Sequence, residues 1–301
     1  MLEVALLGTG GMMPLPNRFL TSMLCRYKGK LLLVDCGEGT QVTNKMLGWG
    51  FKNIDTICIT HIHGDHITGL TGMLFTMANS HREEAVNIVG PQGVKEVVEA
   101  LLIIAKDLAF QLNYYELTED TEKITLGDFN ISALKVDHRI LCYSYKIEIK
   151  RVGKFSTEKA IENHIPREIW SNLQRKEVVE HQNNIYLPEM VLGEDRKSIV
   201  LSYMTDTRPI DAAYEFVKGS DLFICEGLYG DNEKLDKAIE HKHMTFIEAA
   251  EIAKKADVKE LWLTHYSPAL TVPEDYIQNA RDVFKNTFLG EDRKTTTIFF
   301  E

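Results

Sequence analysis

Residues 61–66 read His61-Ile62-His63-Gly64-Asp65-His66 and directly follow the strand-like run Ile57-Cys58-Ile59-Thr60. Side chains two residues apart in an extended chain point to the same side, so the first two histidines project together. The glycine permits a sharp turn that brings the next carboxylate and imidazole back toward them. Imidazole and carboxylate ligands suit zinc at neutral pH, and a cluster without thiolate favours a catalytic site. The density of these ligands disfavours unrelated surface histidines, and the stretch predicts a metal centre with room for two ions.

Three further side chains of ligating type stand where strand-like segments end. His138 follows segment 131–137, Asp206 follows segment 198–205, and His265 follows segment 260–264. A lone histidine at a strand end is more often packed or solvated than bound to a metal. Three such positions together with residues 61–66 reinforce one another, and a carboxylate can bridge two ions. We therefore expect these three residues to complete the centre.

Six segments, in this order along the chain, resemble the metallo-beta-lactamase superfamily and in particular the short form of ribonuclease Z, the transfer-RNA 3′-processing endonuclease. The segments are Gly8-Thr9-Gly10, Asp35-Cys36-Gly37-Glu38-Gly39-Thr40-Gln41, residues 61–66, Thr205-Asp206-Thr207-Arg208-Pro209, His241-Lys242-His243-Met244-Thr245 and Leu263-Thr264-His265-Tyr266-Ser267-Pro268. The resemblance covers nearly the whole chain. The segments at 35–41 and around His243 are more specific than the shared histidine motif.

The resemblance implies an α/β fold, the metallo-beta-lactamase αββα sandwich of two mixed sheets flanked by helices. We expect residues 1–301 to form a single domain with a projecting substrate-binding arm inserted at about 150–196. The chain has 301 residues, 44% of them hydrophobic, which is enough for one large core. Strands are expected at Val4–Leu7, Lys30–Val34, Thr56–Thr60, Val86–Val89, Phe129–Val136, Ser144–Ile149, Ile199–Met204, Leu222–Cys225 and Leu261–Thr264, and covering helices at Gly93–Leu108 and Thr245–Ala256.

The resemblance also implies how the ligands divide between two zinc ions. One ion would be held by His61, His63 and His138, the other by Asp65, His66 and His265, and Asp206 would bridge them. A hydroxide shared by both ions would attack a phosphodiester, with Asp65 orienting it, so that no protein nucleophile is needed. The same ligands accept manganese or iron.

Cleavage that leaves a 3′-hydroxyl requires a proton for the departing oxygen, which a histidine can supply as general acid. By resemblance that residue is His243, in the family's His-x-Thr element, and Glu226 is the carboxylate beside it. His241 has no such match and is expected to be a solvated loop residue. Asp35 is expected either to fix the tautomer of a ligating histidine or simply to cap a turn. Glycines 8, 10 and 11 could approach a substrate phosphate, but tight turns explain them equally well.

The net charge of −10 and pI near 5.5 oppose long-range attraction of nucleic acid. Residues 146–176 nevertheless hold eight basic and four acidic side chains, a local balance of +4. This island lies where ribonuclease Z carries an arm that grips the elbow of transfer RNA. A solvated surface helix is the alternative, and Asn163–Gln174 lacks the usual Gly-Pro-rich stretch of the family's arm.

Two residue identities discriminate within the superfamily. A zinc beta-lactamase would place a cysteine at Asp206 and a flavodiiron protein a carboxylate at His63, so both are disfavoured. A hydrolase of smaller phosphodiesters with the same centre remains an alternative to the precursor transfer-RNA endonuclease, and a non-catalytic RNA-binding module is a remote one. Homodimerisation is the family expectation.

Five scattered cysteines indicate a reducing, cytoplasmic location. The N-terminal segment is too short and too acidic for a signal peptide, and no apolar run reaches membrane-spanning length. The apolar patch 101–105 is therefore expected to be a buried helix face or a subunit contact.

Overall fold

The structure is a computed structural model and describes residues 1–105, 108–151, 153–175, 177–194 and 196–301. The backbone divides into two compact units. The first unit comprises residues 1–148 and 200–299, and the second comprises residues 149–199 with 300–301. We call the first unit the main body and the second unit the arm, and the expected insertion at about 150–196 falls within the arm.

The first sheet of the main body is mixed. Its strand order is β16-β1-β2-β3-β4-β5-β6, antiparallel from β16 to β3 and parallel from β3 to β6. The strands are β1 (Leu2–Gly8), β2 (Ser22–Tyr27), β3 (Lys30–Val34), β4 (Ile54–Cys58), β5 (Val86–Pro91), β6 (Leu112–Leu117) and β16 (Thr295–Ile298). The inner strands read as apolar runs because both of their faces are covered.

The second sheet repeats this mixed design. Its order is β15-β14-β13-β12-β9-β8-β7, parallel from β15 to β12 and antiparallel from β9 to β7. The strands are β7 (Thr121–Leu126), β8 (Phe129–Lys135), β9 (Tyr143–Arg151), β12 (Arg196–Met204), β13 (Leu222–Glu226), β14 (Leu261–Thr264) and β15 (Thr287–Leu289). The ends of β9 and β12 continue into the arm.

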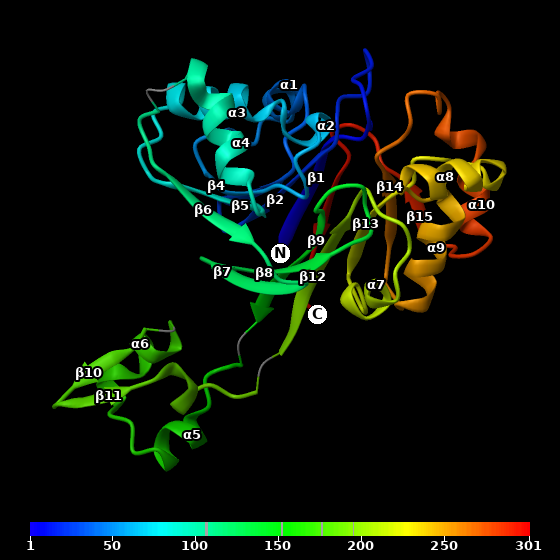
Figure 1. Cartoon of the computed structure of the whole chain (residues 1–301). Helices are drawn as coiled ribbons and strands as arrows, with labels where there is room; N and C mark the ends of the chain where they lie inside the picture. The colour runs from blue at the N-terminus through cyan, green and yellow to red at the C-terminus, as the bar shows by residue number, and fades with distance from the viewer. Residues whose placement is uncertain (106–107, 152, 176, 195) are drawn as a thin grey trace. The chain divides into compact units, whose positions relative to one another are not determined.

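Helices cover the outer face of each sheet (Figure 1). On the first sheet lie α1 (Thr40–Leu47), α2 (Gly64–Ile67), α3 (Leu70–Asn79) and α4 (Val94–Leu101), which is followed by η1 (Leu102–Ile104). On the second lie α7 (Asp211–Phe216), α8 (Leu235–His241), α9 (Phe246–Lys255) and α10 (Ile277–Arg281), with η4 (Asn232–Lys234) and η5 (Pro273–Asp275) between them. Each helical layer buries its own apolar cluster against its sheet. The predicted αββα sandwich is confirmed.

Buried tyrosine hydroxyls join the two sheets. The hydroxyl of Tyr145 donates to the carbonyl of Ile59 at 2.7 Å, and the hydroxyls of Tyr203 and Thr21 lie 2.9 Å apart. Both tyrosines are almost fully buried, so these bonds cross a dry interior where an unpaired hydroxyl would be costly. They fix the strand ends of one sheet against those of the other.

The nine predicted strands are all present, and the helix predicted at 245–256 is α9. Thr245 caps α9 with Glu248 in a capping box. The helix predicted at 93–108 is shorter than expected: α4 ends at Leu101, η1 ends at Ile104, Leu108 is not helical, and residues 106–107 lie outside the described residues. Ile103 and Ile104 are 63% and 86% exposed, so a buried helix face is wrong for these two residues. No helix among the described residues has the length and apolar character needed to cross a membrane.

The arm has a small core of its own. Its elements are α5 (Thr157–Glu162), η2 (Arg167–Ile169), α6 (Trp170–Gln174), β10 (Val179–His181), β11 (Asn184–Tyr186) and η3 (Pro188–Met190). The indole of Trp170 packs 5.1 Å from the ring of Phe155 and donates to the carbonyl of Ile165 at 3.0 Å. Leu173 and Val191 are fully buried beside them. Lys176 of the basic island lies outside the described residues.

Candidate metal centre and active site

The predicted ligands follow strands whose ends meet along one edge of the sandwich. His61 comes after β4, His138 after β8, Asp206 after β12 and His265 after β14. Asp206 and His265 have φ of 45° and 57°, in the left-handed region that non-glycine residues rarely adopt. Such a conformation costs about 1–3 kcal/mol and persists where surrounding structure enforces it. Here it turns the chain sharply as it leaves each strand.

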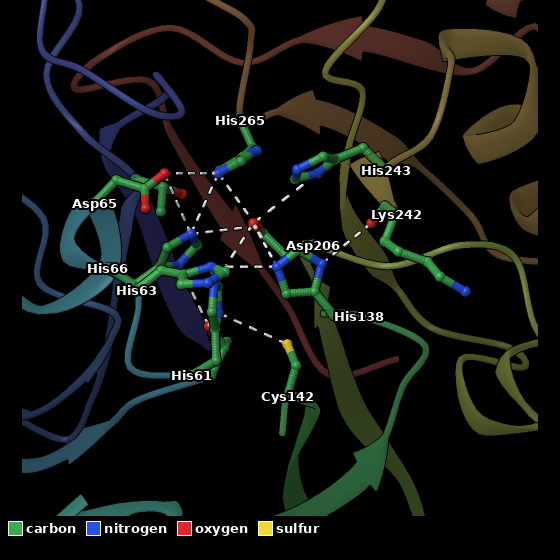
Figure 2. Close-up of polar contacts among 12 residues, drawn as sticks. His61, His63, Asp65, His66, His138, Cys142, Asp206, Lys242, His243 and His265 are labelled. Atoms are coloured by element: carbon green, nitrogen blue, oxygen red, sulfur yellow. Dashed lines mark hydrogen bonds and ion pairs between the residues drawn. The ribbon is translucent and has the colours of Figure 1, made fainter. Parts of the chain in front are cut away.

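Three histidines and one carboxylate form the first ligand group. Nε2 of His61 lies 3.0 Å from Nδ1 of His63, which lies 3.3 Å from Nε2 of His138. Oδ2 of Asp206 is 3.6 Å from His61 Nε2 and 3.7 Å from His138 Nε2. The structure thus gathers the residues that the resemblance assigned to one ion, and Figure 2 shows their rings converging.

A second group lies against the other oxygen of Asp206 (Figure 2). Oδ1 of Asp206 is 3.2 Å from His66 Nε2 and 3.1 Å from His265 Nε2. Asp65 completes this group, with its Oδ2 3.4 Å from His265 Nε2 and 3.7 Å from His66 Nε2. One oxygen of Asp206 therefore faces each group, which is the arrangement expected of a bridging carboxylate.

The spacing within both groups fits metal binding. Ligand atoms about 2.0–2.1 Å from a tetrahedral zinc lie roughly 3.3 Å from each other. The separations of 3.0–3.7 Å between the ligand atoms bracket this value. Oδ1 of Asp206 is also buried without a hydrogen-bond partner among the described residues. A buried carboxylate oxygen normally has a partner, so this one is well placed to receive a cation.

Other groups orient the ligand rings through their second nitrogens. Nδ1 of His66 lies 2.8 Å from Oδ2 of Asp35, which takes the predicted tautomer-fixing position. Nδ1 of His138 donates to the carbonyl of Lys242 at 3.2 Å. Nδ1 of His61 lies 3.0 Å from the hydroxyl of Thr60 and 3.7 Å from the thiol of Cys142. Sequence reasoning did not identify Lys242, Thr60 and Cys142 as partners of the ligand rings. Only Thr60 could have been suspected, because it directly precedes His61.

The buried histidines and carboxylates of the cluster shift one another's pKa values. Burial alone would raise the pKa of Asp206, but His265, His66 and His61 hold that pKa well below its usual range. Burial and the nearby His66 lower the pKa of His61 well below its usual value, which favours the neutral form that binds metals. Burial opposes protonation of His66 too, but the carboxylates of Asp206 and Asp35 raise its pKa well above the ordinary value. A metal ion held by His66 would therefore compete with a proton for this ring.

His243 and Glu226 form a buried pair beside the ligands. Nδ1 of His243 donates to the Glu226 carboxylate, at 3.1 Å from Oε2 and 3.2 Å from Oε1, and lies 3.9 Å from Oδ2 of Asp206. Burial would lower the pKa of His243, but the Glu226 charge outweighs it and raises this pKa to about 9. Glu226 also accepts the backbone N–H groups of Thr207 at 2.7 Å and Met244 at 3.1 Å. Glu226 thus holds the imidazole in place and favours its protonated form, with Nε2 left for a substrate.

Arg208 supports this pair although the sequence analysis gave it no role. Its guanidinium donates to the carbonyl of His243 and forms a two-point ion pair with Glu248, one of whose bonds is 3.0 Å. Such planar pairing restricts both partners. The segment bearing His243 is therefore anchored to α9 as well as to Glu226.

A pocket of about 530 Å³ opens over these groups and has His63, Asp65, His138, Asp206, His243 and His265 in its wall. Arg139 and His241 also line it. His241 ends α8 rather than lying in a loop, and its Nδ1 is 3.0 Å from the hydroxyl of Tyr229. The expectation of a solvated loop residue is therefore wrong for His241.

The N-terminal glycines serve tight packing. The N–H of Gly10 donates to the carbonyl of Phe19 and that of Gly11 to the carbonyl of Tyr266, at 2.9 and 3.0 Å. A Cβ on Gly11 would lie 2.6 Å from Cε1 of His265. Both N–H groups already have backbone acceptors in distant segments, so neither is available to a substrate phosphate.

Comparison with known families and structures agrees with this geometry. The chain matches the beta-lactamase superfamily domain over residues 189–266 and the Anti-Pycsar protein Apyc1 family over residues 2–189. It is similar to the structure of human tRNase Z, short form, with a TM-score of 0.72 and 24% identity over 99% of this chain and 100% of that one. It is also similar to the metallo-beta-lactamase fold protein YhfI from Bacillus subtilis, with a TM-score of 0.71 and 21% identity over the same shares of both chains. The fold and the site thus define a protein of the metallo-beta-lactamase class.

Curated relatives narrow the assignment. Ribonuclease Z of Lachnoclostridium phytofermentans is 52% identical over 301 residues, which cover 100% of this chain and 99% of the relative. Ribonuclease Z of Clostridium kluyveri is 52% identical over 303 residues and 100% of both chains. The chain belongs to the ribonuclease Z family, and its residues 2–189 also carry the domain that the Apyc1 model describes. The resemblance noted in the sequence is confirmed.

Proposed function

We propose that this chain is a metal-dependent endoribonuclease that removes the 3′ trailer of precursor transfer RNA and leaves a 3′-hydroxyl. Membership in the ribonuclease Z family supports the reaction class. The observation that carries the proposal is the joint placement of two ligand groups and the His243–Glu226 pair around one pocket. A non-catalytic RNA-binding module would need neither, which argues against that reading.

The cofactor we propose is a pair of zinc ions, with manganese or iron as substitutes. His61, His63 and His138 would hold one ion, Asp65, His66 and His265 the other, and Asp206 would join them. Two such cations lower the pKa of water and stabilise the negative charge that builds on an attacked phosphodiester. The spacing of the ligand atoms and the buried Oδ1 of Asp206, which accepts no hydrogen bond among the described residues, support this assignment.

The chain's own residues supply orientation and a proton. Asp65 accepts the backbone N–H of Met12 at 2.7 Å, which fixes its carboxylate at the pocket wall, where it orients the attacking water. His243 donates a proton from Nε2 to the departing 3′-oxygen, since its Nδ1 is engaged by Glu226. Glu226 positions the ring and stabilises its charge.

We propose that the arm binds transfer RNA. Residues 149–199 contain nine basic and eight acidic side chains, so acidic residues farther along the arm offset the positive charge of the island at 146–176. The hairpin β10–β11 and its flanks expose apolar side chains: Val178 is 63% and Ile185 66% exposed. Apolar and basic groups together suit unstacked bases and the RNA backbone better than a charge patch alone.

We propose a cytoplasmic homodimer in which the exposed Phe75, Ile103 and Ile104 contribute to the subunit contact. Exposed apolar groups gathered on one helical layer are typical of such contacts. Light scattering of wild type and Ile104→Glu tests this: a dimer that dissociates in the variant supports the contact, and an unchanged mass contradicts it.

The test offers precursor transfer RNA and, separately, a small chromogenic phosphodiester to the metal-loaded protein and to an arm deletion. Gly193 N–H donates to the carbonyl of Lys154 at 2.8 Å, and a Cβ on Gly153 would lie 2.1 Å from the carbonyl oxygen of Gly193. Joining Gly153 to Gly193 therefore removes residues 154–192 without stretching the chain. We expect the deletion to weaken RNA cleavage at least about tenfold more than diester hydrolysis. Turnover of the small diester alone would make the chain a general phosphodiesterase.

A further inference from the structure

A second cavity, of about 300 Å³, adjoins the metal pocket. Leu228 lines both cavities. Tyr229 lines the second cavity, and its hydroxyl lies 3.0 Å from Nδ1 of His241, which lines the first. A single layer of side chains therefore separates the two. We call this second cavity the tyrosine pocket; its wall includes Leu228, Tyr229, Lys234, Lys237, Leu270 and Tyr276.

Part of the wall of the tyrosine pocket is apolar and aromatic. Leu228 and Leu270 are buried, and Tyr229 and Tyr276 are half-buried. A Cβ on Gly230 would lie 2.6 Å from Cβ and Cγ of Tyr276, so the Tyr276 side chain packs directly on bare backbone. Aromatic faces of this kind are what proteins offer to unstacked RNA bases, because every base has a π-face.

The rim of the tyrosine pocket carries charges of both signs. Two basic residues, Lys234 and Lys237, and two acidic residues, Asp231 and Glu233, line it. Oδ1 of Asp231 already accepts the N–H of Glu233 at 2.9 Å. A wall that combines aromatic faces with balanced charge favours an uncharged base inside, and the exposed Lys234 and Lys237 can approach a flanking phosphate. A phosphate inside the pocket would meet two carboxylates.

Backbone hydrogen bonds attach the tyrosine pocket to the segment that carries the general acid. Tyr229 forms a bridge with Thr245, two residues after His243, and the N–H of Phe246 donates to the Tyr229 carbonyl at 2.9 Å. In an in-line displacement the attacking water and the departing oxygen lie on opposite sides of phosphorus. The ribose that bears the departing oxygen therefore lies on the His243 side, which is the side of the tyrosine pocket.

We propose that the tyrosine pocket binds the base of the nucleotide whose 3′-oxygen departs, stacked on Tyr276. This inference rests on the proposed endonuclease function and on the placement of His243 at the leaving group. It makes the last nucleotide retained in the product a determinant of cleavage, through a subsite separate from the metal ligands.

Four measurements of kcat/KM test the subsite. Wild type and Tyr276→Leu are each given intact precursor transfer RNA and the same RNA made abasic at the last retained nucleotide. Base stacking on an aromatic side chain is worth about a tenfold effect or more, so the abasic change should cost the wild type about that factor. In Tyr276→Leu the intact RNA should already be slower by a similar factor, and removal of the base should cost less than about twofold more. Tyr276→Phe keeps the ring and should behave as wild type.

The controls separate this inference from the function beneath it. RNA made abasic at the first trailer nucleotide should slow wild type and Tyr276→Leu by the same factor. If loss of the last retained base lowers kcat/KM by the same factor in both proteins, and thermal melting shows that both are folded, the subsite is overturned. Coupling of Tyr276 to the trailer base would overturn its placement. If wild type cleaves no precursor at all, the proposed function fails and the subsite fails with it.

Discussion

Replacement of His243 by alanine should slow RNA cleavage far more than hydrolysis of an activated diester. His243 is bound through Nδ1 to Glu226 at 3.1 and 3.2 Å, and its Nε2 is the nitrogen left to protonate a leaving oxygen. Loss of a general acid costs about 10²–10⁴-fold, or about 2.7–5.4 kcal/mol of transition-state stabilisation. The 3′-oxygen of a ribose needs that proton, whereas a nitrophenolate departs readily without one.

The assay compares kcat for precursor transfer RNA with kcat for bis(p-nitrophenyl) phosphate in His243→Ala. We expect a loss of about 10²–10⁴-fold on RNA, less than about tenfold on the diester, and unchanged metal content. His241→Ala is the matched control, since His241 lines the same pocket but binds the Tyr229 hydroxyl instead of a carboxylate. Equal losses on both substrates, or loss of metal from the variant, would refute the assignment of His243 as general acid.

Three further predictions concern the ligands, the buried carboxylate and the core. Asp206→Ala removes the oxygens that face both ligand groups, so bound metal measured by plasma mass spectrometry should fall from about two ions per chain to one or fewer; full occupancy in the variant would exclude a bridge. Glu226→Gln should lower kcat on RNA by about 10- to 100-fold while leaving metal content unchanged, because the ring loses its charged partner; an unaltered kcat contradicts this role. Phe246→Ala removes a fully buried ring at the start of α9 and should lower the free energy of unfolding, measured with urea, by about 3–5 kcal/mol. A decrease below about 1 kcal/mol would show that the surrounding residues close the cavity.

The convergence of the candidate ligands could be predicted because residues 61–66 give a strong local signal, which three weaker positions at strand ends reinforce. Residues 61–66 combine a strand end, a glycine turn and four ligating side chains in one short stretch. Asp206 and His265 each follow an apolar strand, and parallel strands end at the same edge of a sheet. Which oxygen of Asp206 faces which group was beyond sequence reasoning, because it depends on a left-handed turn and on packing between distant strands.

The elements that escaped prediction also have physical reasons. The apolar run 101–105 continues a helical pattern, but α4 gives way to η1 and leaves Ile104 exposed, so periodicity overestimated the helix. β7 alternates exposed and half-buried residues at the edge of its sheet, where a weak apolar signal is enough for pairing. The carbonyl of Lys242 reaches His138 from 104 residues away in the sequence, and a contact made by backbone leaves no trace in residue type.

The most direct test of the account is the chemistry of the two RNA ends. The metal-loaded protein is given a precursor transfer RNA in ¹⁸O-labelled water, and both fragments are weighed by mass spectrometry. The account predicts a 3′-hydroxyl on the transfer RNA and a 5′-phosphate carrying one solvent oxygen on the trailer, because water attacks phosphorus and the 3′-oxygen departs with a proton from His243. A 2′,3′-cyclic phosphate on the transfer RNA, or a trailer phosphate without solvent oxygen, would contradict it.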